Sequence, residues 1–182
     1  MNRNTYIPAF LTLVSAVAIL AMKRKREQNI SVMNNYFGNS EFTNSDTAKR
    51  LGIVNDPTDQ AWSNLFALRD NILNPARRKL SRPIYITSGY RSPELNAAVG
   101  GASNSQHTTG EAVDITTRNL ALNKRLFAIL AQMNFDQLIW EKGGEWIHVS
   151  YRQEPYTNRG QLLAYNGTSY QNINNNWQTI IA

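Results

Sequence analysis

Two histidines and one aspartate are spaced so that they could bind a metal ion. His107 lies in a stretch rich in glycine, serine, asparagine and threonine, Asp114 follows in a predicted strand, and His148 lies in the last predicted strand. Aspartate is uncommon in strands, and burying its charge is costly unless the charge is paired or binds a metal. Two imidazoles and a carboxylate fill three positions of a tetrahedral zinc ion and leave the fourth for water, as in catalytic sites. Single histidines are more often structural, but that alternative leaves the strand aspartate unexplained.

The composition narrows the chemistry further. The chain has no cysteine, so disulfides, thiolate zinc sites and a cysteine nucleophile are excluded, and any metal must be bound by nitrogen and oxygen. The net charge is +6, but five of the 19 basic and one of the 13 acidic residues lie in residues 1–35. The remainder has 14 basic and 12 acidic residues, a net charge of +2. We therefore expect no nucleic-acid partner.

The residues around His107 belong to a longer motif. Residues 105–114 read SQHTTGEAVD and fit the pattern S-x-H-x-x-G-x-A-x-D. This pattern resembles the zinc D-Ala-D-Ala carboxypeptidases and L-alanyl-D-glutamate endopeptidases. That family includes vancomycin-resistance D,D-dipeptidases and many phage lysis enzymes, and it shares its fold with the hedgehog signalling domain. The resemblance spans residues 36–165 and is also carried by TSGYRSP at 87–93, VGG at 99–101 and WIHVS at 146–150.

The resemblance implies a ligand set and a general base. It assigns His107, Asp114 and His148 as ligands of Zn²⁺. Zinc lowers the pKa of a bound water toward about 7, and a nearby carboxylate can then take its proton. Two glutamates are candidates for this carboxylate, Glu141 and Glu145.

The choice between the two glutamates depends on a predicted hairpin. Glu145 stands three residues before His148 and matches the E-x-x-H spacing of the dipeptidase branch. In that branch the tryptophan directly precedes the histidine, whereas Trp146 stands two residues before it. A two-residue turn at 143–144 would pair Glu141 with Trp146, which shares a face with His148 because strand side chains alternate. The pattern favours Glu141, which would then face the metal.

Four further residues are candidates for contact with substrate. Arg91 lies in the Y-R-S segment of the resemblance, which implies that it binds a substrate carboxylate or stabilises the oxyanion; a surface salt bridge is the alternative. Tyr90, Ser105 and Gln106 are predicted to hold polar groups of the substrate. Ser105 and Gln106 could equally form hydrogen bonds within their loop.

The resemblance implies that the substrate is a peptidoglycan stem peptide. It leaves open whether a D-Ala-D-Ala or an L-Ala-D-Glu bond is cut, and the short chain without a separate wall-binding module favours a lytic endopeptidase of phage type. The alternative is a non-catalytic, zinc-containing, membrane-anchored protein that has a structural or cell-wall-binding role, since this fold does not guarantee catalysis. Retention of the three ligands and the candidate glutamates argues against that alternative.

The elements that position these residues indicate an α+β fold with a small, largely antiparallel sheet and flanking helices, of the hedgehog/DD-peptidase type. Helical periodicity begins after Asp56-Pro57, with Asp56 as the cap, and continues to about Leu80. Residues 152–182 are polar and rich in asparagine, and we expect them to form a peripheral tail. The other elements are strands at 83–87, 112–116, 137–141 and 146–151 and helices at 92–101 and 120–133.

The N-terminal region predicts a membrane anchor. Tyr6 to Met22 is a 17-residue stretch without charge, near the lower limit for a transmembrane helix, and the basic residues 23–26 follow at once. A buried core helix and a cleaved signal peptide are the alternatives; the all-round apolar character and the KRKR run disfavour them. We expect an anchor at 1–26, a linker at 27–35 and a peptidase domain at 36–182. The positive-inside rule places that domain in the cytoplasm, whereas peptidoglycan lies on the other side of the membrane. This conflict favours a phage protein that lies in a virion membrane or in the host inner membrane and acts once lysis begins.

Overall fold

The computed structural model describes residues 18, 20–22 and 35–181. The chain divides into two units, Met1–Asn35 and Tyr36–Ala182. Within the described residues, no helix combines the length and the apolar character needed to cross a bilayer. The anchor predicted at 6–22 falls mostly outside these residues and stays a prediction.

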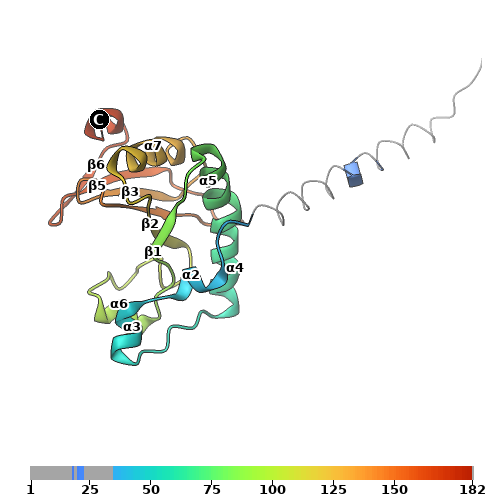
Figure 1. The fold of residues 1–182 in the computed structure, drawn as a ribbon, viewed down its shortest axis with the longest axis vertical. Helices are drawn as coiled ribbons and strands as arrows, with labels where there is room; N and C mark the ends of the chain where they lie inside the picture. Colours follow the sequence, from blue (N-terminus) through green and yellow to red (C-terminus); the bar gives the residue numbers. More distant parts are fainter. Residues whose placement is uncertain (1–17, 19, 23–34, 182) are drawn as a thin grey trace, which may run out of the picture. The chain divides into compact units, whose positions relative to one another are not determined.

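A six-stranded, mostly antiparallel sheet forms the centre of the second unit (Figure 1). The strand order is β1-β2-β4-β3-β5-β6, and every neighbouring pair is antiparallel except β3 and β5. The predicted α+β class and the four predicted strands are confirmed, with the first strand starting two residues later than expected. The strands are β1 (Tyr85–Ser88), β2 (Ala112–Thr116), β3 (Gln137–Glu141), β4 (Trp146–Ser150), β5 (Gln161–Tyr165) and β6 (Tyr170–Asn172).

The helices flank this sheet. Figure 1 shows α7 on one side of the sheet and α3 and α6 on the other. The longest helical run consists of α4, the π-helical turn η1 and α5 without a break. The helices are α2 (Asn39–Thr43), α3 (Asp46–Leu51), α4 (Asp59–Leu68), η1 (Arg69–Leu73), α5 (Asn74–Leu80), α6 (Pro93–Ala98), α7 (Leu120–Leu130) and α8 (Trp177–Ile180).

The predicted start of the long helix was wrong. Thr58, not Asp56, is the N-cap of α4, and its side-chain oxygen accepts a hydrogen bond from the Ala61 amide over 3.2 Å. The run continues to Leu80 as expected, but it widens to a π-turn just before Pro75. Proline has no N–H for the carbonyl four residues earlier, which gives a physical reason for the irregular turn at this point.

The sheet has one face for the core and one for the site. Strand alternation turns Val113, Ile115, Ile147, Val149 and Leu138 into the hydrophobic core, where they are fully buried. The intervening residues of β2, β3 and β4 project from the opposite face. Every candidate ligand on a strand belongs to that second face.

The prediction of a peripheral tail at 152–182 was wrong in part. Strand β5 pairs in parallel with β3 and is an inner strand of the sheet. Leu162, Ile173 and Ile181 are buried in the main core. The polar composition of the segment reflects β6 and the loops, which are exposed, and it obscured the short apolar run of β5.

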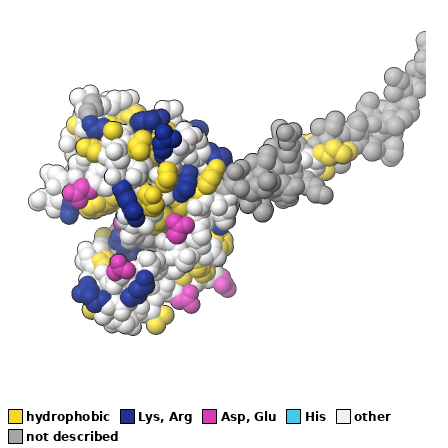
Figure 2. All heavy atoms as spheres, in the orientation of Figure 1, with side chains coloured by type: hydrophobic (Ala, Val, Ile, Leu, Met, Phe, Trp, Pro, Cys, Tyr) yellow, Lys and Arg dark blue, Asp and Glu magenta, His cyan; other side chains and the backbone are white. Residues whose placement is uncertain are grey.

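The positive charge of the folded unit is unevenly spread. Figure 2 shows Lys and Arg side chains gathered over α5 and α7, whereas elsewhere on this face they are interspersed with acidic side chains. Arg78 and Lys79 at the end of α5 and Arg125 on α7 are among the exposed basic residues of these helices.

Candidate metal centre

Three elements bring the predicted ligands together. Asp114 lies in the middle of β2 and His148 in the middle of β4, and the two residues are direct partners in the antiparallel register. Their side chains therefore leave the same face of the sheet side by side. His107 reaches them from the loop between α6 and β2, and the Arg91 amide donates a hydrogen bond to the His107 carbonyl over 3.2 Å. All three side chains are buried.

The three potential ligand atoms form a small triangle. His107 Nε2 lies 3.2 Å from His148 Nδ1 and 3.3 Å from Asp114 Oδ1, and His148 Nδ1 lies 3.0 Å from Asp114 Oδ1. Two ligands of a tetrahedral zinc ion, with bonds of about 2.0–2.1 Å, are separated by roughly 1.6 bond lengths, or about 3.3 Å. The donor set and its spacing therefore fit one zinc ion. Among the described residues, His107, Asp114 and His148 form the cluster of side chains that could hold a metal ion.

The orientation of His107 is fixed by its second ring nitrogen. Nδ1 lies 2.7 Å from the carbonyl oxygen of Gly89, which can only accept a hydrogen bond. Nδ1 must therefore carry the hydrogen, and the lone pair of Nε2 faces the triangle. Gly89 can lie this close because it has no side chain: a Cβ there would collide with the backbone carbonyl of Phe42.

The loop from His107 to Asp114 turns at Gly110. Gly110 has φ of +75°, in the left-handed region that favours glycine, and a Cβ there would collide with the backbone of Ala61. Two features therefore require glycine here: the sharp turn between the two ligands and the close approach to α4.

Arg91 supports the aspartate ligand. Its Nη2 donates to Asp114 Oδ2 over 2.7 Å, and its Nε donates to Ser88 Oγ over 2.8 Å. Oδ2 is therefore bound by a guanidinium while Oδ1 faces the two histidines. Burial disfavours the ionised form of Asp114, but the contacts with His107 and His148 outweigh it and hold the pKa of Asp114 far below its ordinary value. The aspartate is thus ready to act as an anionic ligand.

The structure separates the two candidate glutamates. Glu141 pairs with Trp146 across the hairpin, as predicted, although four residues rather than two connect the strands. It is buried, and it lines the same cavity as the three potential ligands. Glu145 lies in the connecting turn, where its side chain is exposed and does not line that cavity.

The environment of Glu141 alters its protonation. Burial, and after it the negative charge of Asp114, raise the pKa of Glu141 from 4.5 to about 7. The positive charges of His148, Lys142 and Arg91 oppose this rise without cancelling it. A carboxyl group with a pKa near neutrality can both accept and donate a proton under ordinary conditions.

A cavity of about 470 Å³ opens over the triangle. Its floor is the site face of the sheet, including Ile139 and Trp146, and its rim is the loop that follows α6. Tyr165 and Tyr170 form part of its wall, with ring centroids 4.5 Å apart. The cavity is large enough for a short peptide segment beside a metal ion.

The predicted substrate contacts divide between this cavity and other places. Ser105 and Gln106 line it, as does Arg91. Ser105 also accepts a hydrogen bond from the His107 amide over 3.4 Å, so it supports the loop as well.

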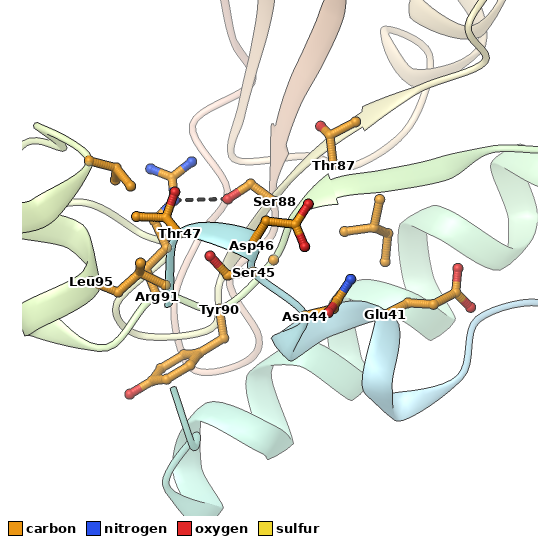
Figure 3. A pocket seen from close by; sticks show the side chains of 13 residues that line it. Glu41, Asn44, Ser45, Asp46, Thr47, Thr87, Ser88, Tyr90, Arg91 and Leu95 are labelled. Atoms are coloured by element: carbon orange, nitrogen blue, oxygen red, sulfur yellow. Dashed lines mark hydrogen bonds between the residues drawn. The ribbon is translucent and has the colours of Figure 1, made fainter. Parts of the chain in front are cut away.

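Tyr90 does not line this cavity, contrary to the prediction that it contacts substrate there. It is buried in the hydrophobic core and borders a separate hollow of about 390 Å³ (Figure 3). Figure 3 shows its ring directed away from the contact between Ser88 and Arg91. The backbone explains this, because Tyr90 is held by its amide to the Phe42 carbonyl, and successive side chains of an extended segment point in opposite directions.

The sequence reasoning missed an ion pair at the rim of the cavity. Arg159 Nη2 donates to Asp136 Oδ2 over 2.6 Å, and Asp136 is fully buried. Gln106 Nε2 donates to the same oxygen over 3.0 Å. Asp136 could have been noticed as a charged residue directly before the predicted strand β3. Nothing in the polar segment after β4 distinguished Arg159 from its neighbours.

Comparison with known proteins identifies the family. The sequence profile described as peptidase M15 matches residues 35–150, well over half of the chain. The chain belongs to the peptidase M15 family. No curated protein sequence matches it significantly. Peptidases of the M15 family depend on zinc, and His107, Asp114 and His148 are the residues that can hold it here. This M15 protein is therefore a zinc metallopeptidase, as the resemblance of its motifs implied.

Proposed function

We propose that this M15 peptidase hydrolyses an amide bond of peptidoglycan stem peptides. The observation that carries the proposal is the convergence of three potential zinc ligands and the buried Glu141 on one open cavity. A structural zinc site has four protein ligands and no cavity, whereas a catalytic site keeps a position open and needs a proton acceptor beside it.

The chain's own residues have separate tasks in the proposed reaction. When bound, zinc supplies a Lewis acid that polarises a carbonyl and acidifies water. Glu141, buried in the cavity beside the three potential ligands, accepts a proton from the attacking water and returns it to the leaving amine. Arg91 keeps Asp114 oriented through Oδ2, and the Gly89 carbonyl keeps His107 in the required tautomer.

The cleaved bond and the location are further parts of the proposal. An open cavity that runs along the sheet suits an endopeptidase acting within the stem, and we favour the bond between L-Ala and D-Glu. We also propose a lytic role for a phage protein that residues 6–22 anchor in a virion membrane or the host inner membrane. Protease treatment of intact spheroplasts tests the topology, because complete protection of the folded unit would contradict display on the outer side.

Digestion of purified peptidoglycan tests the activity. The full chain is incubated with purified peptidoglycan, with zinc and with a chelator in parallel, and the fragments are analysed by mass spectrometry. New zinc-dependent termini are expected, and their masses identify the bond. Absence of such termini, in a protein that binds zinc, would favour a cell-wall-binding or structural role.

A further inference from the structure

A buried carboxylate fixes a guanidinium at the rim of the cavity. Asp136 is fully buried, and its Oδ1 accepts hydrogen bonds from the Arg159 amide and from Arg159 Nε, each over 3.1 Å. Its Oδ2 accepts from Arg159 Nη2 over 2.6 Å and from Gln106 Nε2 over 3.0 Å. Burial disfavours the charged acid, but the hydrogen bond from Arg159 outweighs it and lowers the pKa of Asp136. The guanidinium is therefore held along one edge by an ionised partner.

One nitrogen of this guanidinium, Nη1, remains available to bind a ligand. In the described part of the chain, Nη1 of Arg159 donates no hydrogen bond to a protein group, and half of the side chain, 51%, is exposed. Arg159 lines the cavity that contains the metal ligands, and its Nη2 also donates to Gln106 Oε1 over 3.4 Å. Gln106 directly precedes the ligand His107 in the chain, so its hydrogen bond with Arg159 places Arg159 close to the loop that carries this ligand.

Arg159 and Arg91 are the two cationic side chains in the described lining of the cavity. Arg91 is only 17% exposed and binds the ligand Asp114 and Ser88. Arg159 is three times as exposed and holds no ligand of the metal. Of the two, Arg159 is the one whose Nη1 group is available to donate to a substrate carboxylate.

We infer that Arg159, held in place by Asp136, binds a carboxylate of the substrate and makes the enzyme selective for it. This inference rests on the proposed function and specifies its substrate. A stem peptide with L-lysine at its third position offers two such groups: the α-carboxylate of its γ-linked D-glutamate and its C-terminal carboxylate. Arg159 lies outside residues 35–150, so the selectivity comes from the segment after the part that matches the family.

Three synthetic peptides distinguish the two carboxylates. They are L-Ala-γ-D-Glu-L-Lys-D-Ala, the same peptide with D-isoglutamine, and the same peptide with a C-terminal amide. Binding to the full zinc-loaded chain is measured by calorimetry in a Glu141→Gln background, which prevents turnover. We expect one of the two amidations to weaken binding about tenfold, the lower end for loss of a charge-assisted hydrogen bond at a half-exposed group.

Two variants locate the effect. In Arg159→Gln the same amidation is expected to change the affinity less than twofold. In Arg159→Lys, which keeps the charge opposite Asp136, the effect of amidation is expected to lie between those in the parent and in Arg159→Gln. Arg152→Gln is the matched control, because Arg152 lies in the same segment but does not line the cavity; it is expected to behave as the parent. The ratio between peptides is independent of the fraction of folded protein.

The outcomes separate the inference from the proposed function. If the parent does not distinguish the carboxylate from the amide, or if Arg159→Gln distinguishes them as well as the parent, the inference is wrong. If binding depends on the carboxylate and on Arg159 but the unmodified enzyme cuts none of the peptides, the inference holds and the proposed hydrolysis fails.

Discussion

Replacement of Glu141 by glutamine should make the zinc-free protein more stable and the zinc-loaded protein inactive. The substitution keeps the shape of a buried side chain and removes its charge. Burial and Asp114 raise the pKa of Glu141 from 4.5 to about 7, so the folded state binds a proton more tightly than the unfolded state. The stability contributed by this group is therefore complete below about pH 4.5 and is lost as the pH rises to about 7.

The size of the effect follows from the same shift. A difference of about 2.5 pKa units corresponds to about 3 kcal/mol, because each unit represents about 1.4 kcal/mol. Above pH 7 the Glu141→Gln variant should exceed the parent in free energy of unfolding by up to about 3 kcal/mol. Near pH 4.5 the two proteins should be similar. Bound zinc favours the charged carboxylate, so loading with zinc should reduce the difference.

Denaturant unfolding between pH 4.5 and 8 measures this difference. The full chain, its Glu141→Gln variant and a Glu145→Gln control are stripped of zinc and compared. The control should follow the parent, because the side chain of Glu145 is exposed. Other titrating groups are common to all three proteins and cancel in the comparison. Identical pH dependence of the parent and Glu141→Gln would refute the reasoning about burial.

The same variants test the proposed catalytic role. Loss of a general base lowers kcat by about 100-fold to 10,000-fold, so zinc-loaded Glu141→Gln should be nearly inactive and should keep its affinity for zinc. Glu145→Gln should retain activity. The opposite result, an active Glu141→Gln and an inactive Glu145→Gln, would assign the base to the E-x-x-H position instead.

Three further predictions concern the metal centre. Removal of zinc with a chelator should abolish hydrolysis and lower Tm, which thermal unfolding with and without added zinc measures; an unchanged Tm would contradict a site at the triangle. Arg91→Gln should weaken zinc binding by about 10-fold to 100-fold through loss of its hydrogen bond to Asp114, as competition with a chromogenic chelator would show. Gly89→Ala should lower the free energy of unfolding by more than about 2 kcal/mol, because the new methyl group meets the backbone carbonyl of Phe42. Denaturant unfolding measures this loss, and an unchanged stability would show that the loop can shift to accommodate the methyl group.

The metal ligands were predictable because the motif around His107 resembles a known family and because an aspartate within a strand calls for a partner or a metal. Asp114 and His148 each interrupt an apolar strand, and antiparallel pairing brings them opposite one another. Strand alternation predicted the side on which Glu141 lies, even though the turn is longer than expected. For Glu141, alternation along the hairpin is enough to determine the face of the sheet from which the side chain projects.

Other features depend on contacts that spacing does not reveal. Asp136 and Arg159 meet because the chain crosses over and returns as β5, parallel to β3. A parallel pairing needs a long connection, and the part of that connection after β4 carries no periodic pattern. Tyr90 was misplaced for a related reason: its direction is set by the hydrogen bond of its amide to Phe42, in a helix remote along the sequence.

The metal centre combines two rigid ligands with one that depends on support. Asp114 and His148 are fixed by the hydrogen bonds of the sheet, so their separation is independent of the loops. His107 is positioned by the Gly89 carbonyl at its ring and by the Arg91 amide at its backbone. Because Arg91 also holds Asp114, one residue connects the loop ligand to a strand ligand. Changes at residues 89–91 should therefore alter zinc affinity and the placement of His107 together.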